Sequence, residues 1–501
     1  MTTKREILLQ VRFGHQVAEQ ELDQLSSYFV ETDQWRRVLS GEIDVVYGPK
    51  GAGKSAIYGL LLSRRDALFD TQILLAPAEN PQGTLAFAGI ATDPPTSEAQ
   101  FRALWKLYLL SLAAMVLDDF DVGGDSAKTL RQVLEDHGLL PRGKGLTGFL
   151  SAARYYASNA FPPDSIQGGI ETDPTTGLPR GFTGKITFRE PAPPAIEQGY
   201  WSVDALLSLA NLALDQAGYD LWLLLDRLDV AFAEDQALEH NALRALFRVY
   251  LDLAGHDHIR LKIFLRTDIW ERITSSGFRE ASHISRNMTI SWDNNSLLNL
   301  IVRRAIQNES LQAFLQVDPM QVLASAEGQT QFFYRLFPNQ VDIGEKKPST
   351  FDWMVSRTRD GLGRTAPREL IHLLNALRDV QIRRLEEGQP EPEGELLFER
   401  ATFKEALEEV SRARVELTLL AENPSLQASI LALKGEKATQ YPESLAAIWD
   451  VNAAEATKTA EALTHAGFFE IRGTRDQPEY WVPFLFRDAL HLVQGSAELE
   501  E

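Results

Sequence analysis

The first part of the chain alternates between short apolar runs and longer segments with helical spacing. The runs at 43–47, 73–75, 221–225, 259–265 and 288–292 have the length and composition of buried strands. Between them, apolar side chains recur at three- and four-residue intervals, most clearly over 98–158 and 202–217, which predicts helices. Strands that alternate with helices favour a parallel sheet with right-handed crossovers. The pattern therefore predicts an α/β domain with five parallel strands.

The pattern changes after residue 296, where it is almost purely helical up to about residue 465. Two short apolar segments at 467–473 and 480–483 then flank a turn and predict a terminal hairpin. We therefore divide the chain into a core at 1–292, a helical segment at 293–412 and a terminal unit of helices plus hairpin at 413–501. Within the core, residues 160–198 are rich in Pro, Gly and Thr. They predict an insertion with at most a small hairpin near 184–189, which is either functional or a solvated excursion without a role.

A phosphate-binding loop follows the first predicted strand. It fits the pattern G-x-x-x-x-G-K-[ST] without a mismatch, and its residues are Gly48, Pro49, Lys50, Gly51, Ala52, Gly53, Lys54 and Ser55. Glycines let successive N–H groups point at phosphate oxygens, and the helix predicted at 56–63 presents its positive end. Lys54 would neutralise the β- and γ-phosphates, and the Ser55 hydroxyl would bind Mg²⁺. The loop therefore predicts a site for ATP and Mg²⁺, whereas a plain glycine-rich turn leaves the Lys-Ser pair unexplained.

The third predicted strand ends in acid, because residues 221–229 read L-W-L-L-L-D-R-L-D. The carboxyl end of a buried parallel strand opens on the ligand site of such a sheet. Asp226 is therefore placed to bind Mg²⁺ opposite Ser55, and Asp229 is a candidate to polarise the attacking water. The simpler alternatives are a helix N-cap for Asp226 and a solvated turn carboxylate for Asp229.

Composition narrows the class of protein. The 501 residues carry a net charge of −20 and no cysteine, so disulfides, thiolate zinc sites and cysteine nucleophiles are excluded. The N-terminus lacks the apolar core of a signal peptide, and the longest apolar stretch, 107–117, is about half of what a membrane span needs. We expect a soluble, cytoplasmic protein without a membrane partner. The acidic charge disfavours nucleic acid as a partner but leaves local basic patches open.

The nucleotide core, the helical segment and the terminal unit together resemble the AAA+ superfamily, most nearly its origin-recognition-like and STAND branches. The run 224–229 is similar to the STAND acidic motif, in which a second acid lies three residues after the first. Conventional AAA+ proteins have glutamate immediately after the aspartate, where this chain has Arg227. Residues 28–62 also resemble an uncharacterised group of bacterial P-loop ATPases. The resemblance implies that 293–412 is a helical lid and that 413–501 is a winged helix.

The resemblance also implies roles for particular arginines. Arg266, after the fourth strand, matches the sensor that reads the γ-phosphate. Pro367 and Arg368 begin a predicted helix and match the second sensor, where an arginine reaches back to the phosphates. An arginine in a first helical turn is unfavourable against the helix dipole and is easier to understand if an anion lies nearby, although an ordinary exposed arginine is the alternative. AAA+ assemblies keep an arginine finger between the fourth and fifth strands, and the candidates are Arg272, Arg279 and Arg286, among which the sequence gives no choice.

The terminal unit is a weak candidate for DNA binding. In the winged helix implied by the resemblance, the recognition helix would be 452–466, whose polar face offers Glu455, Thr457, Lys458, Glu461 and His465. Residues 423–490 hold nine acids against six bases. Such a balance favours intramolecular or protein contacts over DNA.

The sequence as a whole predicts an ATP-binding protein, a Mg²⁺-dependent ATPase that acts as a nucleotide-controlled switch. ATP and ADP would be its ligands, and a homo-oligomer and a further protein its partners. By analogy with STAND-like ATPases, the switch would serve bacterial signalling or defence against phage. Two alternatives remain: a DNA-binding initiator or loader, and a non-hydrolysing scaffold that keeps nucleotide as a structural ligand, which Arg227 motivates.

Overall fold

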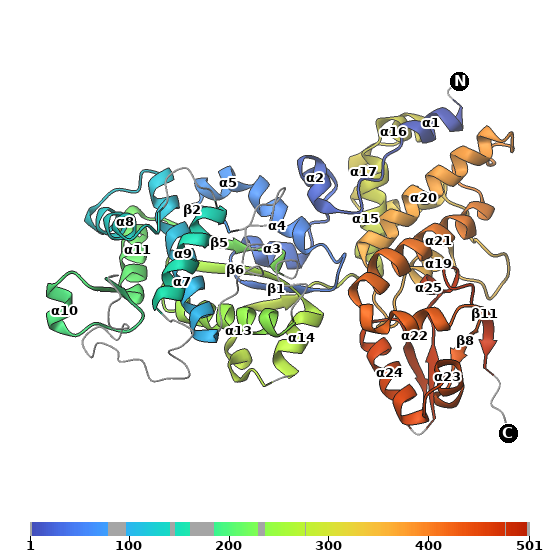
Figure 1. Cartoon of the computed structure of the whole chain (residues 1–501). Coiled ribbons are helices and arrows are strands. Elements are labelled where there is room, and N and C mark those ends of the chain that lie inside the picture. Colours follow the sequence, from blue (N-terminus) through green and yellow to red (C-terminus); the bar gives the residue numbers. More distant parts are fainter. Residues whose placement is uncertain are drawn as a thin grey trace. The chain divides into compact units, whose positions relative to one another are not determined.

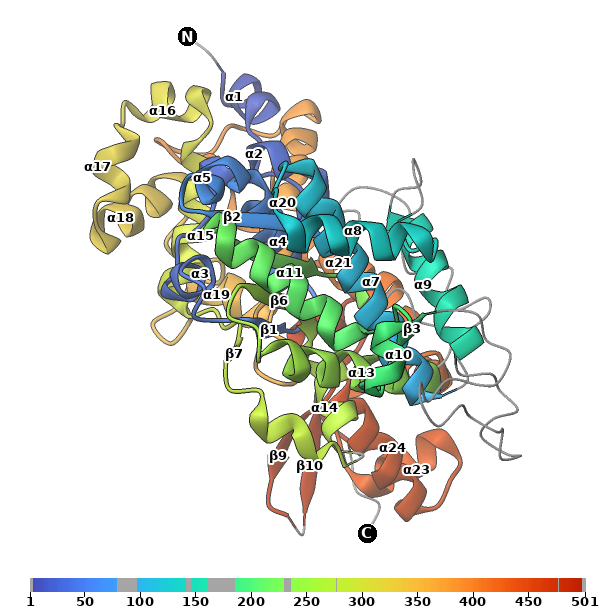
Figure 2. The same cartoon turned by 90° about the vertical axis from the view of Figure 1, so that its left-hand side faces the viewer.

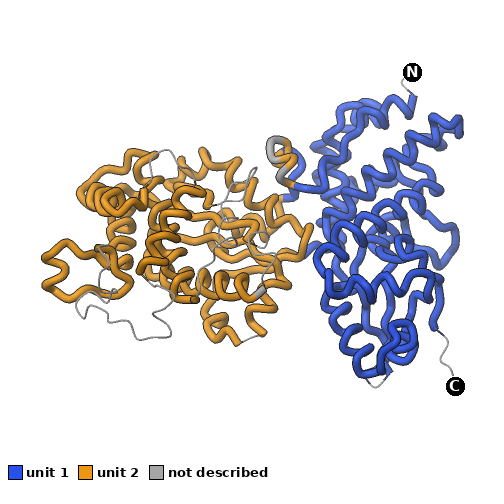
Figure 3. The backbone as a smooth tube through the Cα atoms, in the orientation of Figure 1, with its two compact units in different colours: residues 1–17, 27–30, 291–501 blue, residues 18–26, 31–290 orange. Residues whose placement is uncertain are grey.

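The structure is a computed structural model that describes residues 3–78, 97–140, 146–160, 185–228, 236–275, 277–475 and 477–497. The chain divides into two compact units (Figure 3). The α/β unit comprises residues 18–26 and 31–290, and the helical unit comprises residues 1–17, 27–30 and 291–501. Each unit is described by itself below.

A five-stranded parallel sheet forms the centre of the α/β unit (Figure 1). Its strands are β1 (Val45–Gly48), β2 (Ile73–Pro77), β5 (Asp220–Leu225), β6 (Ile259–Arg266) and β7 (Asn287–Thr289). They lie in the order β2-β5-β6-β1-β7. The inner strands are apolar along almost their whole length because helices cover both faces of the sheet. The predicted α/β fold class, with five parallel strands in the core and a largely helical region after it, is confirmed.

Alternate residues of β6 show how the two faces are covered. Leu261, Ile263 and Leu265 join one large core with α7 (Glu98–Asp119), α11 (Val203–Ala217), α13 (Gln236–Leu253) and α14 (Thr267–Ser275) (Figure 2). On the opposite face, Phe264 packs against Tyr58 of α4 (Lys54–Ser63), with the ring centroids 5.8 Å apart. The helices therefore fix the sheet from both sides and leave its carboxyl edge to the loops.

Helix α7 is the one helix in the described part of the chain that is long and apolar enough to cross a membrane. Of its apolar window, 89% is buried inside the structure, and Leu104, Trp105 and Leu107 are fully buried in the core of the α/β unit. Both facts are typical of the central helix of a globular domain.

The remaining elements of the α/β unit are η1 (Ala18–Gln20), most of α2 (Leu22–Tyr28), α3 (Asp33–Leu39), α5 (Arg65–Asp70), α8 (Asp125–Asp136), α9 (Leu146–Ala160), β3 (Ile186–Thr187), α10 (Pro193–Glu197) and β4 (Trp201–Ser202). The helical stretch predicted over 98–158 is thus three helices. In place of a hairpin near 184–189, β3 pairs in parallel with β4. The rest of the predicted insertion, residues 161–184, lies outside the described residues.

The helical unit is built around one large apolar core that extends from Ile7 to Leu490, beside a small cluster of Val30, Leu300 and Ile371. Its helices are α1 (Lys4–Gln10), α15 (Asn294–Ile306), α16 (Glu309–Leu315), α17 (Pro319–Leu323), α18 (Ala326–Leu336), α19 (Thr350–Arg357), α20 (Pro367–Glu386), α21 (Arg400–Arg414), the π-helix η4 (Val415–Leu420), η5 (Pro424–Leu426), α22 (Gln427–Ala432), α23 (Pro442–Trp449), α24 (Ala453–His465) and α25 (Phe484–Arg487). Helix α1 belongs here because Ile7 and Leu8 are buried in this core and the Lys4 ammonium donates to the carbonyl oxygens of Pro392, Gly394 and Leu396.

A second, four-stranded sheet lies in the terminal part of the helical unit, in the order β11-β8-β10-β9. The predicted hairpin is confirmed as β9 (Glu470–Gly473) paired antiparallel with β10 (Pro478–Trp481). Strands β8 (Lys437–Gln440) and β11 (Val493–Ser496) were not predicted, because neither carries an apolar run. The assignment of this region as a winged helix stays a prediction.

Candidate nucleotide-binding site

The phosphate-binding loop leaves the carboxyl end of β1 and enters α4. Gly51 and Gly53 have φ angles of 80° and 103°, a left-handed conformation that glycine adopts without strain. Helix α4 begins at Lys54, so the Lys-Ser pair of the motif lies in its first turn. Gly53 caps this helix without a side-chain hydrogen bond, and the first turn holds no acid. The positive end of α4 is therefore not neutralised by a side chain of its own cap or first turn, as an anion site requires.

Lys54 lies over the loop that precedes it. Its ammonium donates to the carbonyl oxygens of Gly48 at 3.0 Å and Pro49 at 3.2 Å. A β-carbon at Gly48 would lie 3.3 Å from the β-carbon of Ala52 and 3.4 Å from the Lys54 side chain, so a side chain there would contact both. The ammonium is thus held by carbonyl groups of the loop itself.

The loop lies at the switch point of the sheet. Strands β1 and β6 are neighbours, with Gly48 opposite Arg266. After β1 the chain continues into α4, whereas after β6 it continues into α14, which joins the core on the other face. Open α/β sheets bind ligands in the crevice where adjacent strands send their connections in opposite directions. The motif therefore occupies the position on the sheet at which ligands are expected.

Asp226 directly follows β5 and is 3% exposed. Because β5 pairs in parallel with β6, with Leu225 opposite Ile263, Asp226 lies on the same carboxyl edge as Gly48 and Arg266. The next residue, Arg227, has a φ of 58°, so the chain turns sharply after the acid in a conformation that is uncommon for arginine. The predicted catalytic Asp229 lies outside the described residues.

The Arg266 side chain is held by the carboxylate of Asp268, two residues later in the chain. Its guanidinium makes a forked contact with Asp268, with both N···O distances 3.0 Å. Burial raises the pKa of Asp268, but the charges of Arg266 and Arg272 outweigh that effect, so the pKa lies below its usual value. Arg266 could therefore reach a γ-phosphate only by exchanging one anion for another. Sequence reasoning missed Asp268, although its position two residues after Arg266 was visible.

The three arginine-finger candidates differ in their surroundings. Arg272 contacts both Asp268 and the buried Glu239. Arg286 contacts Asp44 at 2.6 Å and the carbonyl oxygen of Gly41, at the amino ends of β1 and β7. Arg279 lies exposed in η3 (Arg279–His283), and the described residues hold no ion-pair partner for its side chain. Arg272 and Arg286 are thus engaged within their own chain, and Arg279 is the candidate that remains available.

Pro367 and Arg368 open α20 in the helical unit, as the sequence predicts. Proline occupies the first turn, and Ala366 caps the helix without a side-chain hydrogen bond. The Nε atom of Arg368 is buried without a hydrogen-bond partner in the described part of the chain. The next residue, Glu369, accepts from Arg414 at 3.0 Å. An arginine with an unsatisfied donor at the positive end of a helix fits an anion nearby, while its reach to the loop of the other unit stays a prediction.

A divalent cation at this site would depend on few protein ligands. The described residues contain no cluster of three or more His, Asp or Glu side chains that could hold a metal. Mg²⁺ is commonly bound by one or two protein oxygens together with phosphate oxygens and water. The Ser55 hydroxyl in the first turn of α4 and the buried Asp226 carboxylate fit that kind of site.

A G-x-x-x-x-G-K-S loop at the switch point of a parallel sheet is an arrangement typical of phosphate-binding sites. No protein-family model and no curated protein matches the chain.

Three solved archaeal structures are similar over most of its length. The Aeropyrum pernix Orc1 protein in complex with DNA is 13% identical over 98% of this chain and 97% of its own, with a TM-score of 0.33. The Aeropyrum pernix ORC2 protein with ADPNP and ADP is 12% identical over 91% and 92%, with a TM-score of 0.29. The Cdc6p protein of Pyrobaculum aerophilum is 12% identical over 93% and 96%, also with a TM-score of 0.29. Scores this low assign no activity to the chain, and its fold class rests on its own sheet.

Proposed function

We propose that the protein binds ATP with Mg²⁺ at residues 48–55 and hydrolyses it, and that the bound nucleotide sets the state of a switch. The observation that carries the proposal is the loop itself. The end of α4 that has no side-chain cap and the Lys54 ammonium both belong to this loop, which follows β1 at the switch point of the sheet. These are the groups that bind nucleotide phosphates in P-loop proteins.

In this proposal each residue has a defined task. Lys54 would exchange the carbonyl oxygens of its own loop for the β- and γ-phosphates. Ser55 and Asp226 would hold Mg²⁺, which supplies charge neutralisation between the phosphates when it is bound. Asp229 would orient the attacking water. Arg266 would leave Asp268 when a γ-phosphate is present and return after hydrolysis.

The helical unit and a second copy of the chain would complete the switch. Arg368 at the start of α20 would report the nucleotide to the helical unit. Arg279 would act on the nucleotide of a neighbouring copy, which makes the active form a homo-oligomer. We also propose a cytoplasmic location and a protein partner, while a role in signalling or defence stays an analogy.

The first test is nucleotide binding and turnover by the purified full chain. We expect Lys54→Ala to weaken ATP binding at least about 100-fold, because it removes two charge-assisted hydrogen bonds to phosphate. The matched control is Lys128→Ala, which removes an exposed lysine on α8. Unchanged ATP binding by Lys54→Ala would refute the proposal.

The scaffold alternative is separated by Asp226→Asn and Asp229→Asn. An ATPase loses turnover in both variants by about 10²-fold or more, and only Asp226→Asn also loses the dependence of ATP affinity on Mg²⁺. A scaffold binds ATP tightly and shows no turnover above background in the parent chain, so neither substitution changes the rate.

The DNA-binding alternative has one observation in its favour, the exposed Arg472 and Arg475 on the hairpin of β9 and β10. It predicts duplex binding that weakens steeply with salt. The helix that would read bases, α24, carries Glu455 and Glu461, which are both exposed, so we favour protein contacts for this region. Absence of duplex binding at low salt would remove the alternative.

A further inference from the structure

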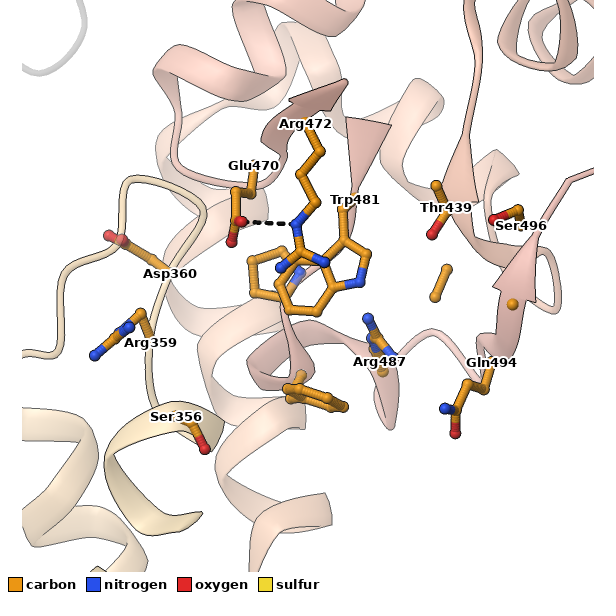
Figure 4. A pocket seen from close by; sticks show the side chains of 14 residues that line it. Ser356, Arg359, Asp360, Thr439, Glu470, Arg472, Trp481, Arg487, Gln494 and Ser496 are labelled. Carbon is orange, nitrogen blue, oxygen red and sulfur yellow. Dashed lines mark hydrogen bonds and ion pairs between the residues drawn. The ribbon is translucent and has the colours of Figure 1, made fainter. Parts of the chain in front are cut away.

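The helical unit contains a hollow of about 580 Å³ beside the terminal hairpin (Figure 4). It is lined by the segment that follows α19, by β8, β9, β10 and β11, and by α25. Three of its lining side chains are arginines, namely Arg359, Arg472 and Arg487. We call this site the arginine hollow. Its volume is in the range of sites that hold small molecules.

Arg487 is the most deeply placed of these cations, with 9% exposure. Its Nε donates to the carbonyl oxygen of Val482 at 2.8 Å, and its guanidinium carbon lies 4.3 Å from the Phe484 ring centroid. The described residues place no carboxylate within ion-pair distance of it. Burial is the main cause that lowers the pKa of Arg487 to about 10; repulsion from Arg472 and Arg357 contributes to this shift, and attraction by Asp488 opposes it. A buried guanidinium that faces other guanidiniums is costly unless an anion joins it.

Aromatic rings hold two of these arginines, Arg472 and Arg487, in place. Arg472 of β9 lies 3.6 Å and Arg487 of α25 lies 4.6 Å from the centroid of Trp481, and Figure 4 shows both converging on this indole from different elements. Next to the hollow, Arg357 lies 3.9 Å from the centroid of Phe484. Guanidinium planes stacked on rings lose little further entropy when they bind a ligand. Arg472 and Arg487 are therefore held near each other before any ligand arrives.

The nearby acids do not cancel this charge. Glu470 accepts from Arg472 at 2.7 Å and is the one carboxylate in ion-pair contact with a lining arginine in the part of the chain that the structure describes. Asp360 instead accepts backbone N–H groups of Leu362 and Arg364, and burial raises its pKa. Three lining arginines thus face two lining carboxylates, Glu470 and Asp360, which leaves an excess of positive charge in a chain whose net charge is −20.

We propose that the arginine hollow binds a small phosphate-bearing anion through Arg359, Arg472 and Arg487. Guanidinium forks match the geometry of phosphate oxygens, and several of them favour a ligand with more than one charge. A DNA backbone carries the same phosphate chemistry. The concave shape, and the excess of nine acids over six bases in residues 423–490, favour a small molecule over a duplex.

The hollow is also joined to the predicted second sensor within the helical unit. Asp360 is followed by Gly361, whose N–H donates to the carbonyl oxygen of Gly467 at 2.7 Å. A β-carbon at Gly361 would lie 2.3 Å from the carbonyl oxygen of Phe469, so this packing admits glycine alone. The same segment continues into Arg368 at the start of α20. An anion in the hollow would therefore act on the helix that carries Arg368, a consequence that rests on the proposed function, whereas the binding site does not.

The binding site is tested by calorimetric titration of inorganic pyrophosphate into the full chain. The chain carries Lys54→Ala, so that the phosphate-binding loop does not contribute. We expect Arg472→Gln to weaken pyrophosphate binding about tenfold or more, since it removes charge-assisted hydrogen bonds. The matched control is Arg475→Gln, an exposed arginine on the same hairpin that does not line the hollow, and it should leave the affinity unchanged. Arg472→Lys should restore part of the affinity.

Three outcomes overturn the proposal. In the first outcome, the Lys54→Ala chain without a further substitution binds no pyrophosphate. In the second, the Arg472→Gln and Arg475→Gln variants bind pyrophosphate equally well. In the third outcome the chain binds duplex DNA with strong salt dependence, both substitutions weaken that binding alike, and pyrophosphate does not compete, which would assign the arginines to nucleic acid. Arg487→Gln serves as a second variant where circular dichroism shows that it folds. All pyrophosphate titrations use the chain with Lys54→Ala. ATP binding is measured on the chain with Lys54 intact, so the two proposals can fail independently of each other.

Discussion

The phosphate-binding loop and the arginine hollow both face an expected anion, but they are made from different parts of the polypeptide. The loop uses backbone N–H groups, a helix end and a single lysine, all within residues 48–55. The hollow uses guanidinium groups stacked on aromatic rings, and its lining extends from Ser356 to Ser496. A backbone site tolerates most side chains, provided that its glycines and its lysine are kept. A side-chain site is weakened when one arginine is replaced.

The two sites also differ in completeness. The hollow has all its proposed ligands in one unit of one chain, whereas the proposed ATPase site needs an arginine from a second copy. The largest effect should therefore come from Arg279→Ala. We expect turnover per chain to fall by about 10³-fold, the usual value of an arginine finger, while ATP affinity stays the same. Turnover of the parent should rise with protein concentration, as measured by phosphate release together with light scattering.

The control for this prediction is Arg131→Ala, which removes a surface arginine that pairs with Asp118 in the same unit. It should leave turnover within a factor of two or so, as is usual for exposed ion pairs. If dilute and concentrated protein turn over equally and Arg279→Ala matches the parent, the site is complete within one chain. The contrast with the hollow would then disappear.

The next largest effect concerns stability. Gly361→Ala would place a β-carbon 2.3 Å from a backbone oxygen, and we expect it to destabilise the helical unit by about 1–3 kcal/mol. Pyrophosphate binding at the hollow should weaken with it, while ATP binding at the loop should not change. Denaturant unfolding and titration calorimetry measure the two effects.

Gly123→Ala is the matched glycine control, because nothing lies within 4 Å of its β-carbon position. Its free energy of unfolding should stay within about 0.5 kcal/mol of the parent. Equal stability of the two variants would mean that the segment at 358–366 adjusts to the added β-carbon at little cost in free energy. An anion bound in the arginine hollow could then not change the position of α20 through this segment.

Sequence alone predicted the parts of this molecule whose signals are contiguous. The apolar runs gave β1, β5 and β6, and the glycine pattern gave the loop with Lys54 and Ser55. The predicted five-stranded sheet is confirmed. It was predictable because buried parallel strands are apolar on both faces and therefore appear in the sequence as continuous apolar runs. The terminal hairpin was found for a similar reason, since Tyr480 and Val482 alternate toward the core.

What the sequence did not reveal depends on distant partners. Strands β8 and β11 carry polar residues and are defined by their hydrogen bonds to each other and, for β8, to β10. The forked contact of Arg266 with Asp268 depends on the side-chain conformations of both residues. The pattern of apolar and polar positions in the sequence does not determine these conformations. The arginine hollow combines Arg359, Arg472 and Arg487 across more than a hundred residues of chain. A sequence motif of neighbouring residues could not have predicted such a site.

A smaller effect should come from freeing Arg266. Asp268→Asn removes the carboxylate that holds it, and we expect the preference for ATP over ADP to rise about threefold to tenfold, in line with one charge-assisted hydrogen bond. Arg266→Gln should make the two nucleotides bind equally. Competition titrations with both nucleotides measure the ratio.

Arg272→Gln is the control for this pair, since it leaves the contact of Arg266 with Asp268 intact. An unchanged ratio in Asp268→Asn and Arg266→Gln would show that Arg266 does not read the γ-phosphate. The loop alone would then distinguish the nucleotides, and Arg266 would have a structural role only.

The smallest effect compares the buried cations of the two units. Lys262 of β6 is 1% exposed, and its ammonium donates to the Asp44 carboxylate at 3.1 Å, whereas Arg487 has no such partner among the described residues. Even so, burial lowers the pKa of Lys262 to about 8 against the attraction of Asp44. Below that pH both the folded and the unfolded chain hold the proton, so Lys262 gives no slope. Between about pH 8 and the unfolded value of 10.5, the unfolded chain binds more protons, and the free energy of unfolding must rise with pH.

We therefore expect the stability of the α/β unit to gain up to about 1 kcal/mol per pH unit from this lysine over about pH 8 to 9.5, relative to Lys262→Met. The window lies below the pKa of Arg487, about 10, and below that of Tyr250 beside Asp44, which burial raises to about 12. Neither group therefore adds a slope of its own. Denaturant unfolding of both variants across this window measures the difference. Parallel pH profiles would mean that Asp44 and the Trp222 ring, 4.1 Å from the ammonium, keep Lys262 fully charged. A buried cation would then be sustained by protein groups alone, and the case for an outside anion at Arg487 would weaken accordingly.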